Sequence, residues 1–475
     1  MLLEKIEDFE TPEFTIIGSG PASICLAMAL EKKNQKVLII EAGGWNPTNE
    51  NQDYYSGKVY GDKYFDLRDV RLRSFGGSAG HWGRAVSPLD EVDFNEWPIK
   101  KKDLDPYIKL TNKILEINND NYTTKHNEIS GFRSCRTIRN DIQFVKKYKK
   151  HILNSKRIFL LLNSPVLKIV EKNQSSSDAG YLVLVNKNKK IKIGIKKLIL
   201  GCGGIENSRI LLWSRHVSKS SFLKGLPIGN FWMEHPTGFV AQFVGEVKKI
   251  DKIIDPNNMY NTLSPTPKFI YDKGINNIRI RIVEEKKKDK GKRLKDFVKD
   301  FICIAPNYGK KIVESIQKKK MLYCHGLIKC SLEQKPYYDN KVTLSENHTD
   351  KLGIPKTNLH WKLTDDFYKT IIVSLEEIGK QFIEKNIGRI GISKFIYDGS
   401  VSKINHIFGN YHHMGGTRMN SNLNLGVVDK NLKVHNTSNF YIIGSSVFPS
   451  GGHHPPTFTI IQLSLRLAEH LTKKT

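Results

Sequence analysis

The alternation of hydrophobic and polar residues is most regular at the two ends of the chain. The apolar run Phe14–Ile17 predicts a short buried strand, and apolar residues at helical spacing between 24 and 33 predict a helix. A second apolar run, Val37–Ile40, predicts another buried strand. Near the C-terminus, Phe440–Ile443 predicts a strand, and Thr459 to about Leu471 predicts an amphipathic helix. The chain therefore opens with a βαβ unit, and the late strand and helix can complete the same sheet.

The turn between the first strand and the helix carries the pattern Gly18-x-Gly20-x-x-Ser23. Gly18 permits a tight turn, Gly20 lets a pyrophosphate approach the helix N-terminus, and the small Ser23 allows close helix packing. Glu41 directly follows the second strand, where a carboxylate can accept hydrogen bonds from ribose hydroxyl groups. This order of elements predicts a dinucleotide site, but it does not separate FAD from NAD.

Composition adds limits to this picture. A length of 475 residues suggests two or three domains, and 39% hydrophobic with 26% charged residues is typical of a globular protein. The formal net charge is +27, but the lysines are scattered and the densest run, Glu284–Lys299, reads as a solvated excursion, so we expect no nucleic-acid partner. We expect no transmembrane segment, no signal peptide and a cytoplasmic location. The six cysteines lack metal-ligand spacing, so reduced thiols and no metal site are expected.

Four further segments carry recognisable phrases in a fixed order. They are FGGSAGHWG at 75–83, LILGCGGIENSRILL at 198–212, GNFWMEHP at 229–236, and the C-terminal stretch from Tyr411 to His470, which includes HHMGGTRM at 412–419 and PTFT at 456–459. Together with shorter phrases between 333 and 361, these segments resemble the glucose–methanol–choline oxidoreductases, especially their bacterial branch. The resemblance covers most of the chain and leaves only about 240–320 unfamiliar.

The resemblance implies an α/β fold in which a discontinuous, Rossmann-like FAD-binding domain receives an inserted α+β substrate domain with a large sheet. We expect the FAD domain at 1–235 and 405–475, and the substrate domain at 236–404 with a basic excursion at about 284–322. The implied cofactor is FAD. Its expected contacts are Gly18, Gly20, Ser23, Glu41, Gly77, Ser78, His81, Trp82, Val166, Gly203, Gly444, Ser445, Pro456 and Thr457.

The resemblance also implies the chemistry, which is transfer of a hydride from an alcohol or sugar CH–OH group to flavin N5. The family's base is the histidine four residues before the threonine of its Gly-Thr pair, which here is His413 with Thr417. Histidine suits the task because its ordinary pKa lies near working pH. His412 is expected to point elsewhere. His81 either carries the flavin covalently, as in some sugar-oxidising members, or lines the flavin site.

One position departs from the family. A histidine or asparagine normally stands just before the final Pro-Thr phrase, but this chain has Pro455, whose side chain can neither donate nor accept a hydrogen bond. Three readings remain open: His454, or less readily His453, takes the role; a backbone carbonyl or a water does; or alcohol oxidation is lost. We take His454 as the second catalytic candidate beside His413.

The expected function is therefore an FAD-dependent oxidoreductase acting on a small alcohol or sugar. The alternatives are a flavin-binding protein that does not oxidise alcohols and, less readily, a basic protein that binds anionic polymers. The substrate and the electron acceptor are left open by the sequence.

Overall fold

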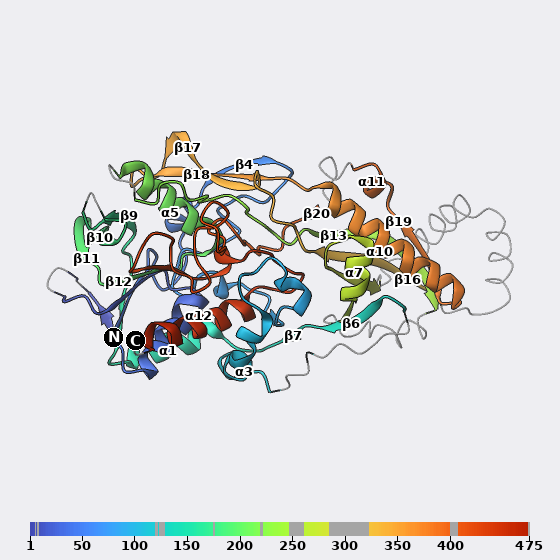
Figure 1. The fold of residues 1–475 in the computed structure, drawn as a ribbon, viewed down its shortest axis with the longest axis horizontal. Coiled ribbons are helices and arrows are strands. Elements are labelled where there is room, and N and C mark those ends of the chain that lie inside the picture. The colour runs from blue at the N-terminus through green and yellow to red at the C-terminus, as the bar shows by residue number, and fades with distance from the viewer. Residues whose placement is uncertain are drawn as a thin grey trace.

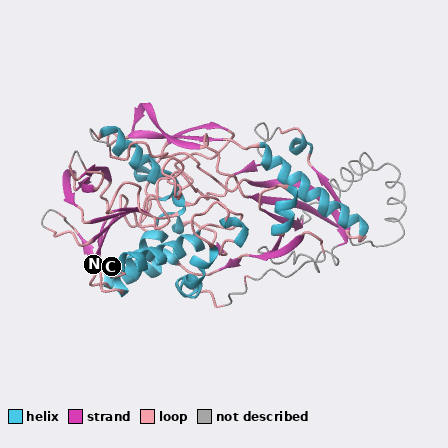
Figure 2. Cartoon of the chain, viewed as in Figure 1, coloured by secondary structure: helices cyan, strands magenta, loops and turns pink. Residues whose placement is uncertain are grey.

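The computed structural model describes residues 1–4, 6, 9–118, 122, 129–173, 176–218, 222–246, 261–284, 323–399 and 407–473. They form an elongated molecule with both termini at one end (Figure 1). A parallel sheet with its helices occupies the end near the termini, and an antiparallel sheet with a long helix occupies the other (Figure 2). The basic excursion expected at about 284–322 lies outside the described residues from 285 on.

The sheet near the termini is parallel throughout and joins strands from distant parts of the chain. Its order is β1 (Leu2–Leu3), β8 (Ile158–Leu161), β3 (Val37–Ile40), β2 (Phe14–Ile17), β12 (Lys197–Leu200) and β21 (Phe440–Ile442). Each of β2, β3, β8 and β21 is fully buried, which explains why their sequences are continuous apolar runs. The strands predicted at 14–17 and 37–40 are confirmed, and the one predicted at 440–443 ends one residue earlier.

Three helices follow strands of this sheet and begin near the carboxyl ends of the strands. They are α1 (Pro21–Lys32), α5 (Gly203–Val217) and α12 (Thr457–Thr472). Helix α1 begins with Pro21, whose missing N–H is not needed at a helix start, and it packs against α12 (Figure 1). Both predicted helices are therefore confirmed, with starts two or three residues earlier than their apolar patterns.

The far end of the molecule is built on an antiparallel sheet. Its order is β19 (Gly388–Ile392), β13 (Thr237–Glu246), β16 (Tyr323–Leu332), β15 (Ile278–Glu284), β14 (Asn261–Pro265) and β6 (Phe132–Arg136), with β20 (Ile407–Phe408) also on β13. One face of this sheet packs against α10 (Asp365–Glu384) in a shared hydrophobic core. Ile280 and Cys330 are among the residues that the sheet contributes to this core. The other face is turned away from that core.

The mixed α/β architecture with two sheets and two separate hydrophobic cores confirms the predicted fold class. The boundaries expected for the two domains stay a prediction. The antiparallel sheet takes β6 from within the range 1–235 and β20 from beyond residue 404, so its strands come from both sides of the expected insertion.

Smaller elements complete the frame. The short sheets are β9 (Val166–Glu171), β10 (Ala179–Asn186) and β11 (Lys189–Gly194); β17 (Lys341–Thr349), β18 (Pro355–Trp361) and β4 (Gly57–Gly61); and β5 (Ala85–Val86) with β7 (Ile138–Arg139). The other helices are α2 (Asn49–Asp53), α3 (Ile108–Leu115), α4 (Phe144–Asn154), α7 (Pro267–Lys273) and α11 (Lys394–Tyr397). In the described part of the chain, every helix is too short or too polar to cross a membrane.

Candidate functional site

A cavity of about 450 Å³ opens at the carboxyl edge of the parallel sheet and extends to the antiparallel sheet. Its wall includes most of the residues predicted from the sequence: Gly18, Gly20, Glu41, Gly77, Ser78, His81, Trp82, Val166, Gly203, His413, Gly444, Ser445, Pro456 and Thr457. Ser23 and His454 are not part of this wall. The cavity follows the carboxyl ends of parallel strands, where ligands of open α/β sheets bind.

Glycines keep one end of the cavity open. A Cβ atom added to Gly20, Gly203 or Gly444 would meet no protein atom within 4 Å, because each of these backbones faces the cavity. Gly18 has a different task, because its φ of +90° favours glycine and an added Cβ would lie 2.7 Å from the Gly201 carbonyl oxygen. Gly18 therefore shapes the turn, while the other three glycines leave room for a group that approaches the backbone.

Glu41 lies at the end of β3 and is 6% exposed. One carboxylate oxygen accepts from the backbone N–H and hydroxyl of Ser19, at 3.0 and 2.6 Å, and the other accepts from the Gly43 N–H at 2.8 Å. Burial raises the pKa of Glu41, and the hydrogen bonds from Ser19 and Gly43 oppose that shift. The oxygen facing Gly43 accepts a single protein hydrogen bond and can accept another from a ligand hydroxyl group.

Ser23 lies behind the cavity wall, between α1 and the turn that follows β12. It is fully buried, and its hydroxyl donates to the Gly201 carbonyl at 3.4 Å. The small side chain lets α1 approach the turn after β12, since a Cβ on Gly201 would lie 2.3 Å from the Ser23 hydroxyl oxygen. Its position corresponds to the close packing predicted for it, and a direct cofactor contact by Ser23 stays a prediction.

His413 reaches the cavity from the loop that precedes β21. Its Nε2 lies 3.1 Å from the Tyr64 hydroxyl, which donates to Glu234 at 2.5 Å. Glu234 also accepts from the backbone N–H groups of His235 and His412, at 2.8 and 2.9 Å. Because the Tyr64 proton points to Glu234, the tyrosine oxygen can only accept from His413. His413 Nε2 therefore carries the proton, and Nδ1 keeps the lone pair.

The electrostatic surroundings of His413 favour the neutral ring. Burial lowers its pKa to about 3, and the positive charges of Arg71 and His81 act in the same direction. The side chain is 8% exposed, and its ring lies beside the Trp232 ring at a centroid distance of 5.8 Å. A neutral imidazole keeps a lone pair that can accept a proton.

His412 also lines the cavity, so the expectation that it points elsewhere is wrong. Its Nδ1 lies 2.9 Å from Nδ1 of His235, whose Nε2 lies 3.3 Å from the Gly451 carbonyl oxygen. The carbonyl can only accept, so His235 donates to it through Nε2 and accepts from His412 at Nδ1. His412 is therefore left with its lone pair on Nε2. Burial, followed by the charge of His235, lowers the pKa of His412.

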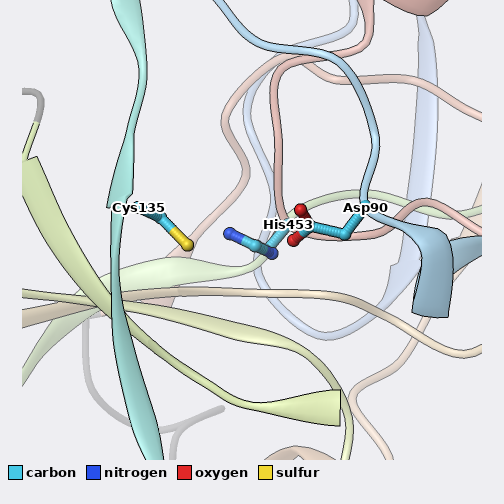
Figure 3. Close-up of side chains that lie close together, drawn as sticks. All are labelled: Asp90, Cys135 and His453. Carbon is cyan, nitrogen blue, oxygen red and sulfur yellow. The ribbon is translucent and has the colours of Figure 1, made fainter. Parts of the chain in front are cut away.

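His453 and His454 lie in a separate buried cluster. Figure 3 shows the His453 ring beside the Cys135 thiol and the Asp90 carboxylate, and ligand atoms of these three residues lie within 4.8 Å of one another. Asp90 already forms an ion pair of 2.5 Å with Arg133, and His454 Nε2 lies 3.6 Å from the same carboxylate. The structure therefore brings His454 to Asp90 rather than to the cavity wall.

The donor types in this cluster are ones that zinc uses, but the charges do not suit a metal ion. The Arg133 cation already occupies the Asp90 carboxylate, and burial raises the pKa of the Cys135 thiol to about 11. Although burial of Asp90 opposes the change, its hydrogen bond and charge interaction with His454 lower the carboxyl pKa. The cluster is best described as a buried polar network behind the loop that contains Pro455.

Sequence reasoning missed three groups at or behind the cavity. Glu234 lies within the quoted phrase at 229–236, so its motif was visible although its hydrogen bonds were not. Arg279 lies in the stretch IRIRIV, whose alternation is typical of a half-buried strand with cations on one face. Tyr64 lies in the loop after β4, where no local pattern marks it.

Comparisons with known proteins agree with this geometry. Residues 336–464 match the family model described as GMC oxidoreductase. Over 162 residues the chain is 27% identical to the fructose dehydrogenase large subunit of Gluconobacter japonicus, a match that covers 34% of this chain and 27% of that subunit. The matched stretch thus spans about a quarter of the relative's length.

Solved structures match nearly the whole chain. Pyridoxine 4-oxidase from Mesorbium loti has a TM-score of 0.64 at 12% identity, with 97% of this chain and 99% of that chain covered. A formate oxidase has a TM-score of 0.56 at 15% identity, with 97% and 98% covered. At these identities the likeness shows a shared fold.

Proposed function

We propose that this chain is an FAD-dependent oxidoreductase acting on an alcohol or sugar CH–OH group, in keeping with the match of residues 336–464 to the GMC oxidoreductase family model. The observation that carries the proposal is the single cavity that joins a glycine-walled dinucleotide end to two neutral histidines. The glycine-walled end suits a dinucleotide cofactor, and the histidine end suits removal of a proton from a substrate hydroxyl group.

The residues at the glycine-walled end fit FAD. Gly20, Gly203 and Gly444 leave open space that a side chain would fill, and α1 begins beside that space without an acidic residue in its first turn. A helix N-terminus with free N–H groups favours a pyrophosphate, and Glu41 offers an acceptor to a ribose hydroxyl. FAD, when bound, supplies the acceptor for a hydride.

We assign the proton transfer to His413. His413 lines the cavity with a lone pair on Nδ1, while Tyr64 and Glu234 fix the ring and its tautomer through Nε2. When Nδ1 takes a proton, the imidazolium is stabilised by the Tyr64 oxygen and, behind it, by the Glu234 carboxylate. Tyr64 and Glu234 are positioning residues in this scheme.

We assign the second active-site role to His412, because Pro455 lines the cavity without a donor or acceptor and His454 lies at Asp90. The Nε2 lone pair of His412 is a second acceptor at the cavity wall, so it can accept a hydrogen bond from a second hydroxyl group of the substrate or take the hydroxyl proton in place of His413. The catalytic role expected for His454 from the sequence is untested, and the variant His454→Ala distinguishes it from the role assigned to His412. The expected cytoplasmic location stays a prediction.

Two measurements test the proposal. Purified protein should be yellow, and acid precipitation should release FAD into the supernatant, because a lining role is favoured over a covalent link at His81. Anaerobic addition of alcohols and sugars should then bleach the flavin absorption near 450 nm. A colourless protein that does not take up added FAD contradicts the cofactor assignment.

A yellow protein that no alcohol or sugar reduces points instead to the second candidate function, flavin binding without alcohol oxidation. The proline at position 455 is the observation that favours this alternative, because it removes a polar side chain from the cavity wall.

A further inference from the structure

We propose that the substrate carries an anionic group, a carboxylate or a phosphate, and that Arg279 binds this group at the antiparallel-sheet end of the cavity. The proposal rests on the proposed function, since it adds a substrate class to the same site. It concerns the part of the cavity wall that the antiparallel sheet contributes.

The strand β15 places Arg279 on the face of the sheet that is turned to the cavity. Ile280 is buried in the core shared with α10, so its neighbour Arg279 points to the opposite face. Arg279 lies opposite Ser331 in the strand register, and Ser331 accepts a hydrogen bond of 3.0 Å from Asn410. Arg279, Asn410 and His412 all line the cavity.

Arg279 has an unusual set of partners for an enclosed cation. Its hydrogen bond goes to the neutral hydroxyl of Thr137, at 3.3 Å. Several other enclosed arginines have a carboxylate partner: Arg71 with Glu206, Arg133 with Asp90, Arg209 with Asp350, and Arg418 with Glu96. Arg73, at the other end of the cavity, donates to the Asn51 amide oxygen instead. Within the described ranges, no carboxylate is paired with Arg279. Because enclosed charges are normally paired, this cation fits a site completed by a ligand.

Further cationic side chains lie next to Arg279 on the antiparallel sheet. Arg281 follows on the same face, and Lys329 lies directly opposite Arg281 in the register. Burial first, and then the charges of Arg279 and Arg281, lower the pKa of Lys329. Burial likewise lowers the pKa of Arg279 to about 10, which leaves it charged at neutral pH. Grouped cations attract an anion, and Arg279 is the one of these three that lines the cavity.

Because Arg279 shares the cavity with His412, an anion bound by Arg279 would lie near the proposed catalytic histidines. Arg279 and His412 both line the cavity. Burial lowers the pKa of His412 and of His235, and the charge of Arg279 adds to both shifts. A carboxylate or phosphate can receive two parallel hydrogen bonds from a guanidinium. A substrate anchored there would present a nearby carbinol to His412 and His413.

The first test compares matched pairs of compounds on the holoprotein. Anaerobic flavin reduction is measured with glycerol and glycerol 3-phosphate, and with 3-hydroxybutyramide and 3-hydroxybutyrate. The anionic member of at least one pair should have a kcat/KM roughly 100-fold higher, as expected for a desolvated charge pair. The two pairs distinguish phosphate from carboxylate. Equal rates within both pairs would overturn the proposal while leaving the proposed function standing.

The second test uses variants of Arg279. Arg279→Gln should raise KM for the anionic compound roughly 100-fold, with little change for its neutral partner, and Arg279→Lys should restore part of the selectivity. The matched control is Arg389→Gln, which removes an exposed arginine from β19 of the same sheet and should change neither value. Equal losses for both members of a pair would assign Arg279 a structural role and contradict the proposal.

A binding measurement separates this inference from the oxidation chemistry. Titration calorimetry with inorganic phosphate and with acetate should show binding to the wild-type holoprotein and weaker binding to Arg279→Gln. If no compound reduces the flavin but these anions bind through Arg279, the proposed function fails and the anion site stands. If neither anion binds and anionic compounds have no advantage, the anion site is rejected.

Discussion

At the scale of the residue, His413 carries the most direct prediction. His413→Ala should slow flavin reduction by substrate roughly 10²–10⁴-fold, the usual contribution of a positioned acid–base group. FAD content should persist, because the glycine-walled end of the cavity is formed by Gly20, Gly203 and Gly444, which lie in other segments than His413. Stopped-flow absorbance under anaerobic conditions measures the rate.

The companion variants make this prediction specific. His412→Ala should slow reduction as well, because His412 also lines the cavity, whereas His454→Ala should leave the rate near the wild-type value because its partner is Asp90. A wild-type rate in His413→Ala would reject the base assignment. A large loss in His454→Ala with FAD content unchanged would restore the sequence-based assignment.

The pKa of His413 gives a prediction for the pH profile. A base is active when deprotonated, and burial lowers the pKa of His413 to about 3, so its active form is present at all higher pH values. The rate constant for flavin reduction should therefore be flat from pH 5.5 to 7.5, without the acid limb near 6.5 that an exposed histidine gives. A tenfold fall in rate per pH unit below 6.5 would show that His413 titrates as an exposed group.

The site residues that could be predicted from the sequence lie in local motifs, whereas the residues that could not be predicted depend on contacts between distant segments. Gly20, Glu41 and His413 lie in motifs whose backbone geometry is local, so their neighbours in sequence indicate their task. Tyr64 is hydrogen-bonded to His413, and Arg279 shares the cavity wall with His412. In both cases the two residues lie far apart in the chain. Such partners depend on how the strands register, and a single sequence does not show that register.

At the scale of the element, the same distinction separates the two sheets. Part of the parallel sheet was predictable, because β2, α1 and β3 follow one another and the fully buried strands β2, β3 and β21 have continuous apolar sequences. The antiparallel sheet takes β6 from residues 132–136, which pair with β14 at 261–265. That pairing spans more than a hundred residues of chain, so no local pattern predicts that β6 belongs to this sheet.

The turn between β2 and α1 gives a prediction for two glycines that look alike in sequence. Gly20→Asp should fold normally but lose FAD, because its φ is −69° and its side chain would enter open space where the pyrophosphate is proposed to lie. Gly18→Ala should instead destabilise the fold, because the φ of +90° is strained for alanine and its Cβ would meet the Gly201 carbonyl oxygen. Thermal unfolding and bound-flavin absorbance are measured on both.

The two outcomes are independent, so the pair serves as its own control. A Gly20→Asp protein that keeps the wild-type melting temperature and a full FAD content would place the pyrophosphate elsewhere. A Gly18→Ala protein as stable as wild type would show that the turn tolerates a side chain.

At the scale of the whole molecule, the cavity is where distant parts of the chain meet. Its wall takes Gly20 from the first helix turn, Gly203 from the middle of the chain and Thr457 from the last helix, and it reaches Arg279 on the other sheet. A ligand in this cavity therefore contacts elements that belong to both hydrophobic cores. The bound cofactor should stabilise the fold through all of them, since a ligand that binds only the folded state adds to its stability.

Removal of FAD should loosen the molecule unevenly. Helices α1 and α12 both begin at the cavity wall and pack against each other, so both should lose protection from amide hydrogen exchange when FAD is removed. Helix α10 belongs to the other core and should keep its protection. Exchange followed by mass spectrometry on apo and holo protein tests this, with Gly20→Asp as the control in which added FAD restores nothing. Equal loosening of α10, or unchanged exchange in α1 and α12, would show that the cofactor is not held between the first and last helices.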